Sequence, residues 1–249
     1  MSPLAEFLIY AAVGAAAQLI DGSLGMAYGV TSAGMLLSLG MPPVMASASV
    51  HYAETFTSGA SGISHWLAGN VRWKLFFALV IPGVIGAVIG ANLLTHLPVH
   101  WVRVLLTPYL LLIGVFLLLR TSRPTGYRTD VPRDTIPLGL FAGFLDAIGG
   151  GGWSALTVTT MVARKLEPRR VIGSVHLAKC VVSAAASASF LFSVGAGKFT
   201  VMLGLIIGGV VAAPFGALLA RRMPPRLATL LAGLTVLALG INNAVSLLR

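Results

Sequence analysis

Charged residues are scarce in this 249-residue sequence. Asp, Glu, Lys and Arg together make up only 10% of the chain, whereas 57% of its residues are hydrophobic. Soluble domains carry about a quarter charged residues, so this composition excludes an ordinary soluble fold. Residues 199–220 contain no charge at all, and that is the length of about 20 residues that a membrane-spanning helix needs. The sequence therefore predicts an all-α polytopic membrane protein.

Cysteine and acidic residues are also few. The single cysteine, Cys180, excludes an internal disulfide and a cysteine-rich metal site. The chain has 7 acidic and 17 basic residues. The basic residues lie in short loops between apolar segments, a pattern typical of membrane orientation rather than nucleic-acid binding. No glycine-rich loop ends in Lys-Ser or Lys-Thr, so the sequence gives no sign of a phosphate-binding loop for ATP. We expect no enzymatic activity, cofactor, resident metal or nucleic-acid partner.

A repeated pattern divides the chain into two halves. The segment 21–25 (Asp-Gly-Ser-Leu-Gly) returns at 146–150 (Asp-Ala-Ile-Gly-Gly), and 49–54 (Ser-Val-His-Tyr-Ala-Glu) returns at 174–179 (Ser-Val-His-Leu-Ala-Lys). Duplicated apolar chains with polar residues at matching depths are typical of transporters, whose substrate site lies between the halves. We predict a first transmembrane repeat, a cytoplasmic linker and a second transmembrane repeat, over residues 1–120, 121–134 and 135–249.

The apolar segments predict five helices in each half. Residues 135–164 are too few for two spans of about 20 residues each, so the first two helices of a half should form a re-entrant or broken-helix hairpin, followed by three transmembrane helices. Irregular backbone at this depth must be buried in protein or line a cavity. The expected helices are 4–20, 23–40, 43–69, 74–97, 100–120, 135–148, 152–164, 168–195, 198–221 and 224–248.

The distribution of basic residues predicts the orientation of the chain. If the linker lies in the cytoplasm, thirteen basic residues fall on the cytoplasmic side and three, Arg103, Lys198 and Arg249, fall outside. This asymmetry follows the positive-inside rule only if equivalent loops lie on opposite faces of the membrane. The two repeats should therefore have inverted topology, with the N- and C-termini both on the outer, periplasmic side.

Six ionisable residues lie within apolar segments, where charge is costly and usually functional. His51 and Glu54 are three residues apart and share one helix face, as do their equivalents in the second half. One interpretation is a central polar substrate site between two related helices; the other is a structural ion pair of Glu54 with Lys179, with the histidines bridging helices. The six residues are Asp21, His51, Glu54, Asp146, His176 and Lys179.

Asp21 and Asp146 each precede a glycine-rich break and a new helix. Aspartate is a favoured N-cap, so capping is one interpretation; the other is proton coupling or gating, together with Glu54. Helix N-termini at such breaks can hold an anion through backbone N–H groups. Further candidates for the substrate site are the glycines of the breaks, the aromatics just after them and the serines that open the histidine helices: Gly25, Gly150, Gly151, Tyr28, Trp153, Ser49 and Ser174. The aromatics could instead serve packing alone.

One motif suggests a different class of protein. Residues 59–62, Gly-Ala-Ser-Gly, fit the pattern of rhomboid intramembrane proteases, in which a serine pairs with a histidine. The equivalent of Ser61 in the second half is Ala186, so Ser61 lies outside the repeated polar positions. An intramembrane hydrolase centred on Ser61 is therefore a third hypothesis.

The repeated motifs resemble those of a known family. In each half a glycine-rich break and an apolar helix are followed by proline and a helix that opens with Ala-Ser-Ala-Ser-Val-His or Ile-Gly-Ser-Val-His; a short loop at 69–73 and a small-residue helix at 82–91 follow in the first half. This pattern resembles the TauE/SafE family of sulfite exporters, or 4-toluene sulfonate uptake permeases, over about residues 8–245. Histidines stand where that family more often has threonine or asparagine.

The resemblance implies a multi-pass protein of the bacterial inner membrane that moves a small sulfur-containing anion, of the sulfite or organosulfonate class. We predict a secondary transporter of this kind, with proton coupling as the preferred mechanism. A passive anion channel on the same fold is the alternative. The sequence leaves open the direction of transport, the exact anion and the oligomeric state.

Overall fold

The computed structural model describes residues 2–24, 28–97, 128–195, 197 and 199–222, together with scattered positions at 104–119 and 227–245. The chain described in this way is α-helical, with one isolated bridge between Arg128 and Leu166. Its helices are α1 (Pro3–Leu24), α2 (Tyr28–Ser38), α3 (Pro43–Leu67), α4 (Trp73–His96), α6 (Thr135–Gly149), α7 (Trp153–Ala163), α8 (Pro168–Val194) and α9 (Phe199–Arg222).

Most predicted helices are confirmed to within two residues at each end. The largest differences are at the first break, where α1 continues to Leu24 instead of ending at residue 20 and α2 begins at Tyr28 instead of residue 23. Asp21 therefore belongs to the last turn of α1. The second break falls where it was predicted: α6 ends at Gly149, and Gly150 follows with a positive φ of 67° that favours glycine. The predicted helices 100–120 and 224–248 lie mostly outside the described residues.

Several helices are suited to a membrane. Pro3–Asp21, Trp73–His96 and Arg170–Val194 are long and apolar enough to cross one. Large apolar side chains are exposed on their outer surfaces, for example Ile81, and Phe192 with 90% of its surface accessible. Such surfaces are unfavourable in water and favourable against lipid chains. The protein is therefore a multi-pass α-helical membrane protein.

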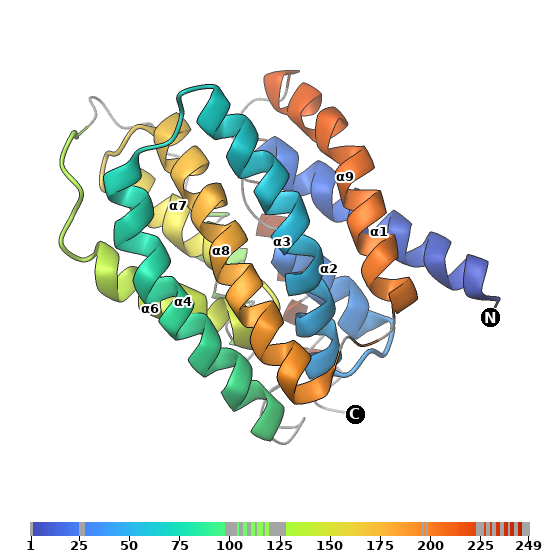
Figure 1. Ribbon diagram of the computed structural model, residues 1–249. Coiled ribbons are helices and arrows are strands. Elements are labelled where there is room, and N and C mark those ends of the chain that lie inside the picture. Colours follow the sequence, from blue (N-terminus) through green and yellow to red (C-terminus); the bar gives the residue numbers. More distant parts are fainter. Residues whose placement is uncertain are drawn as a thin grey trace.

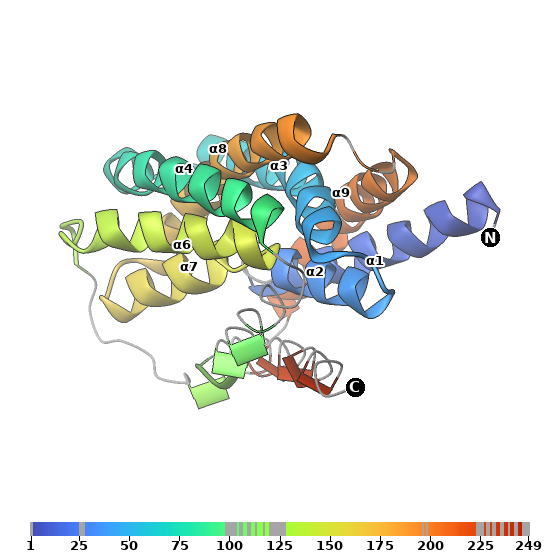
Figure 2. The same cartoon turned by 90° about the horizontal axis from the view of Figure 1, so that it is seen from below.

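Helices from the two halves of the sequence pack against each other (Figure 1). α3 and α8 lie antiparallel at the centre, while α4 packs against α8 and α9 against α3. α1 packs along α9, and its sequence equivalent α6 packs along α4. Figure 2 shows α3, α4 and α8 in one layer, with α2, α6 and α7 beneath them. The helix contacts of one half thus have counterparts in the other: α1 with α9 corresponds to α6 with α4, and α9 with α3 corresponds to α4 with α8.

Glycines allow these helices to approach closely. A Cβ atom at Gly14 of α1 would lie 2.5 Å from the Leu205 carbonyl oxygen of α9. At the equivalent Gly139 of α6 it would lie 2.9 Å from the Leu79 carbonyl oxygen of α4. Small residues at helix contacts are the usual means of tight packing within membranes, where apolar burial supplies little driving force.

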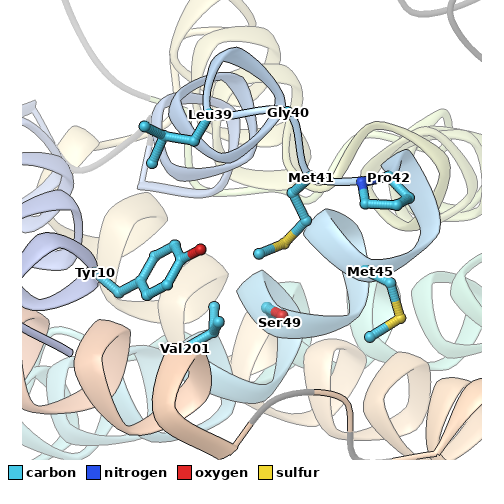
Figure 3. Close-up of a pocket in the computed structure, with 8 residues that line it drawn as sticks. All are labelled: Tyr10, Leu39, Gly40, Met41, Pro42, Met45, Ser49 and Val201. Carbon is cyan, nitrogen blue, oxygen red and sulfur yellow. The ribbon is translucent and has the colours of Figure 1, made fainter. Parts of the chain in front are cut away.

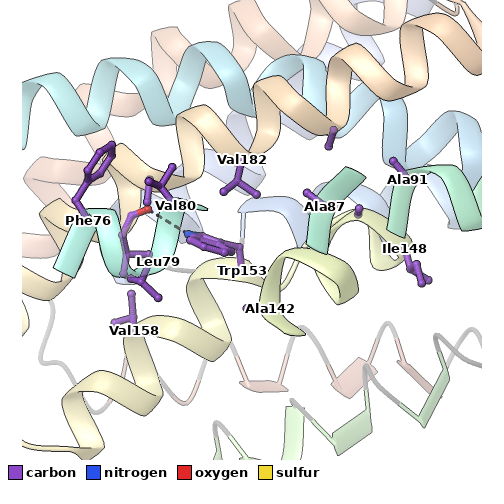
Figure 4. Packing of buried hydrophobic residues seen from close by; sticks show 14 of the residues in the cluster. Phe76, Leu79, Val80, Ala87, Ala91, Ala142, Ile148, Trp153, Val158 and Val182 are labelled. Carbon is purple, nitrogen blue, oxygen red and sulfur yellow. Dashed lines mark hydrogen bonds between the residues drawn. The ribbon is translucent and has the colours of Figure 1, made fainter. Parts of the chain in front are cut away.

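The largest buried side chain, Trp153, fixes α7 to its neighbours (Figure 4). Its ring lies among apolar residues of α4, α6 and α8, including Leu79 and Val182. Its indole N–H donates a hydrogen bond to the Val175 carbonyl oxygen over 3.2 Å, and Gly83 leaves room for the ring. This packing holds the start of the short helix α7 deep within the protein.

Candidate functional site

An ion pair lies at the crossing of α3 and α8. Lys179 Nζ is 2.5 Å from Glu54 Oε1, and both side chains are almost completely buried. The Ser183 hydroxyl, one turn along α8, donates a hydrogen bond to Glu54 Oε2 over 3.3 Å. Residues three or four apart share a helix face. Lys179 and Ser183 therefore both face Glu54 from the same side of α8.

His51, one turn from Glu54 on α3, extends this cluster toward α6. Its Nδ1 atom lies 3.6 Å from Glu54 Oε2 and 3.9 Å from Asp146 Oδ2. Its Nε2 atom lies 3.2 Å from the Asp146 carbonyl oxygen. The Phe190 ring of α8 stacks against the imidazole, with 5.9 Å between ring centroids. The ring is thereby held in one orientation and shielded from water.

The two aspartates at the helix breaks make equivalent hydrogen bonds. Asp21 Oδ1 accepts from the Tyr28 N–H over 3.1 Å at the start of α2. Asp146 Oδ1 accepts from the Trp153 N–H over 2.7 Å at the start of α7. Each carboxylate satisfies a donor that the first turn of a helix leaves free. An anion bound at either helix start would have to share or replace this bond.

The second glycine break packs against the first half of the chain. A Cβ atom at Gly151 would lie 2.1 Å from the Val30 nitrogen of α2, and one at Gly150 would lie 2.7 Å from the Ala33 side chain. The Ser47 hydroxyl of α3 donates to the Ala147 carbonyl oxygen over 2.5 Å. The break between α6 and α7 is therefore buried in protein, as expected of irregular backbone within a membrane.

His176 does not join the cluster around His51. The Ser61 hydroxyl and His176 Nδ1 lie 2.8 Å apart, and the His65 ring packs edge-on against His176. Ser174 lies further toward the start of α8, where its hydroxyl accepts from the Arg72 N–H over 2.8 Å. The sequence-predicted His176 and Ser174 thus lie near the end of α3, on the opposite side of the ion pair from His51.

Ser49 lies elsewhere again, in a cavity of about 250 Å³ between α1, α3 and α9 (Figure 3). The cavity is mostly apolar and includes the loop that joins α2 to α3. Its lining residues are Tyr10, Leu39, Gly40, Met41, Pro42, Met45, Ser49 and Val201.

The two aromatics after the breaks are buried and anchored to neighbouring helices. The Tyr28 hydroxyl donates to the Leu205 carbonyl oxygen of α9 over 3.2 Å, in the same way as the Trp153 indole bonds to α8. These bonds satisfy their polar atoms, so packing is a sufficient account of both rings. Gly25, the remaining predicted site residue, lies outside the described residues.

Four buried polar residues were not anticipated from the sequence. The side-chain oxygens of Gln18, Thr31, Ser32 and Ser154 have no hydrogen-bond partner among the described residues. Unpaired buried polar groups are costly and usually indicate a bound ligand, ion or water. Thr31 and Ser154 are polar residues in apolar segments just after the two helix breaks. This position in the sequence could have identified them as candidate site residues.

The nitrogen and carboxylate oxygens of His51, Glu54 and Asp146 lie within 4.8 Å of one another. This spacing resembles that of metal ligands, but the Lys179 ammonium group already neutralises Glu54 from 2.5 Å away. A divalent ion would be repelled by that ammonium group in a low-dielectric interior. We therefore do not assign a metal centre to this cluster.

Comparison with known proteins gives the family. The model of the "Sulfite exporter TauE/SafE" family matches residues 10–243 of the chain. The chain belongs to the TauE/SafE family. It is 43% identical over 237 residues to "Probable membrane transporter protein YtnM" of Bacillus subtilis, covering 92% of this chain and 79% of that protein. It is 31% identical to the Arabidopsis thaliana "Sulfite exporter TauE/SafE family protein 3" over 94 residues, which is 37% of this chain and 19% of that protein. No solved structure was found to match it.

As a TauE/SafE protein, this chain is a membrane transporter and not an enzyme. The hydrogen bond between Ser61 and His176 is therefore interpreted as a structural or substrate-binding contact, not as a hydrolytic dyad. The sequence-based assignment to the TauE/SafE family is confirmed by the family model, and the Arabidopsis thaliana relative carries the same family name.

Proposed function

We propose that this protein is a secondary transporter of a small sulfur-containing anion, of the sulfite or organosulfonate class, across the bacterial inner membrane. The observation that carries the proposal is the buried polar centre where α3 and α8 cross. It combines one cation, Lys179, with a histidine, carboxylates and unpaired polar oxygens. Such groups within a membrane are costly, and their usual purpose is to form a path for an ion or solute.

The proposed architecture is two inverted-topology repeats around this centre. The antiparallel packing of α3 and α8 supports it, because these helices are equivalent in sequence. So do the equivalent bonds from Asp21 to the start of α2 and from Asp146 to the start of α7. Inverted repeats place the substrate site near the bilayer midplane, beside the starts of discontinuous helices.

The contacts between loops fit the orientation predicted from basic residues. Asn70, after α3, lies against Gly173 near the start of α8, and Arg164 pairs with Asp134. All four residues were assigned to or near the cytoplasmic side. The loop at residues 39–42 lies beside Val201 in the lining of the cavity, and both belong to the predicted periplasmic side. We propose that this cavity is a vestibule through which Ser49 meets the substrate.

Within this scheme, each predicted residue has a proposed role. Lys179, His51 and the backbone at Gly150 and Gly151 contact the anion near the second break. His176 and Ser174 serve the cytoplasmic half of the path. Tyr28 and Trp153 wall the site, Gly25 belongs to the first break, and Asp21, Asp146 and Glu54 act in coupling or gating.

Flux measurements in proteoliposomes test this proposal. Sulfite, thiosulfate, sulfate, an alkylsulfonate and a carboxylate would be compared at two pH values. We expect saturable uptake of at least one sulfur anion, greatly reduced in Lys179→Met and unchanged in Arg170→Gln, whose side chain is exposed. Flux that does not saturate would indicate the alternative, a passive channel. Absence of flux for every sulfur anion would contradict the proposed substrate class.

A further inference from the structure

Three acceptor atoms face one another at the edge of the polar centre. His51 Nδ1 lies 3.6 Å from Glu54 Oε2 and 3.9 Å from Asp146 Oδ2, and all three side chains are fully buried. His51 Nδ1 and Asp146 Oδ2 have no hydrogen-bond partner within the part of the chain that the structure describes. Two carboxylate oxygens and a ring nitrogen therefore lie close together. No hydrogen-bond donor among the described residues lies between them.

The hydrogen bond of His51 Nε2 determines whether Nδ1 holds a proton in the neutral ring. His51 Nε2 lies 3.2 Å from the Asp146 carbonyl oxygen, which can only accept a hydrogen bond. Nε2 must therefore hold a proton. In a neutral imidazole the second nitrogen then has a bare lone pair. With both carboxylates ionised, Nδ1 would present that lone pair to two anions in a site shielded from water, which is strongly unfavourable.

We propose that His51 Nδ1, Glu54 Oε2 and Asp146 Oδ2 share a single bound proton, and that this proton is the coupling ion of the transporter. The second clause rests on the proposed function. Taken without the nearby Asp21 carboxylate, which is occupied by the Tyr28 N–H, the two carboxylates of the cluster and the Lys179 ammonium group sum to one negative charge, which one proton neutralises. Buried charges are tolerated when they are compensated in this way.

None of the described residues around the cluster donates a hydrogen bond to His51 Nδ1 or Asp146 Oδ2. α8 contributes Lys179, which pairs with the other Glu54 oxygen, and Ser183, which donates to Glu54. α1 contributes Asp21 and α2 contributes Tyr28, but the Asp21 carboxylate accepts from the Tyr28 N–H and the Tyr28 hydroxyl donates to α9. The remaining face of the ring is covered by Phe190.

Within its described residues, the second half of the chain does not repeat this arrangement. Lys179 stands where the first half has Glu54, and His176 Nδ1 lies beside the Ser61 hydroxyl. The described residues therefore form one such proton site despite the duplicated sequence, and transport should move one proton through this site per cycle.

Asp146 connects the proton to the anion. Its Oδ1 atom accepts from the Trp153 N–H at the start of α7, while Oδ2 faces the shared proton. A proton on this carboxyl removes its charge and weakens it as a helix cap. The Trp153 N–H at the start of α7 then becomes available to an anion. Proton binding and anion binding would thus favour each other at this helix start.

Spectroscopy on the purified protein in lipid nanodiscs tests the proton without any substrate. Nitrogen-15 NMR of labelled histidines reports whether Nδ1 is protonated, and infrared difference spectra report protonated carboxyl groups. His51→Asn identifies the His51 signals, and His176→Asn is the matched control in the other half. Glu54→Gln and Asp146→Asn identify the carboxyl bands.

At neutral pH we expect either a protonated His51 Nδ1 or a carboxyl band that is lost in Glu54→Gln or Asp146→Asn. His176→Asn should leave these signals in place. A bare Nδ1 with both carboxyls ionised would overturn the proposal. So would a His51 signal that shifts on addition of a chelator, because a metal ion would then occupy the site.

Transport measurements separate this proposal from the proposed function. If wild-type flux of sulfite is accompanied by one proton and Asp146→Asn loses that coupling, both are supported. If the spectra show the proton but no sulfur anion is transported, the proton site stands and the substrate class is wrong. Sulfite flux independent of a proton gradient would refute the coupling role.

Discussion

Glu54 and Lys179 occupy equivalent positions in the two halves of the sequence, 125 residues apart, and their side chains form an ion pair of 2.5 Å. A pair of this kind can form only where the two equivalent helices cross. The two equivalent positions thus carry residues of opposite charge. The repeat brings the two positions together, and the difference between the halves makes the contact electrostatically favourable.

Breaking this pair should destabilise the protein. Lys179→Met leaves Glu54 buried without its partner, at an expected cost of about 3–5 kcal/mol. Thermal unfolding in detergent would measure the loss. The double variant Glu54→Gln with Lys179→Met should recover most of it, because no charge is then left unpaired.

The exposed pair of Glu167 with Arg170 is the control for this experiment. It lies at 3.1 Å but is open to solvent, so Arg170→Gln should cost less than about 1 kcal/mol. Similar losses in Lys179→Met and Arg170→Gln would contradict the assigned burial of the central pair.

The contact between Gly151 and α2 should not tolerate a side chain. In Gly151→Ala the new Cβ would lie 2.1 Å from the Val30 backbone nitrogen. Neither backbone can move without separating the halves, so we expect a loss above about 3 kcal/mol or no folded protein. The yield of monodisperse protein after purification would measure this.

Gly40→Ala provides a matched comparison. Gly40 has a positive φ of 83°, and that of Gly151 is 159°, but a Cβ atom added at Gly40 would meet nothing within 4 Å. Backbone strain alone should cost about 1 kcal/mol. If Gly40→Ala impaired folding as strongly as Gly151→Ala, the close approach would not be the cause.

The Asp21 cap should depend mainly on an acceptor oxygen, with the carboxylate charge adding a smaller share. Asp21→Ala leaves the buried Tyr28 N–H without its partner, which we expect to cost about 1–2 kcal/mol. Asp21→Asn retains an oxygen in the same place and should keep most of the stability. Chemical unfolding of the two variants would compare them; equal losses would show that the carboxylate charge matters instead.

Cysteine labelling would test the proposed orientation. In a Cys180→Ala background, Leu39→Cys lies in an exposed loop before α3 and Leu67→Cys at its exposed end. We expect a membrane-impermeant maleimide added to intact cells to label position 39, and to label position 67 only after lysis. The reverse pattern would place the linker outside and refute the predicted topology.

The sequence by itself determined the class of this protein. Its apolar segments indicated the helices because lipid offers no hydrogen-bond partners to the backbone, so long apolar runs must be helical. Proline and glycine placed most helix ends within two residues, since they act through local backbone geometry. The six ionisable residues were also evident, because each stands out against apolar neighbours.

Only the tertiary structure decided which of these residues meet. Helical spacing predicted that His51 and Glu54 share a face, but the position of Asp146 beside them depends on how α6 packs across α3. His176 was expected to be the counterpart of His51, yet it contacts Ser61 and His65. Helix crossings are set by side-chain packing between segments over a hundred residues apart, and no local pattern encodes such contacts.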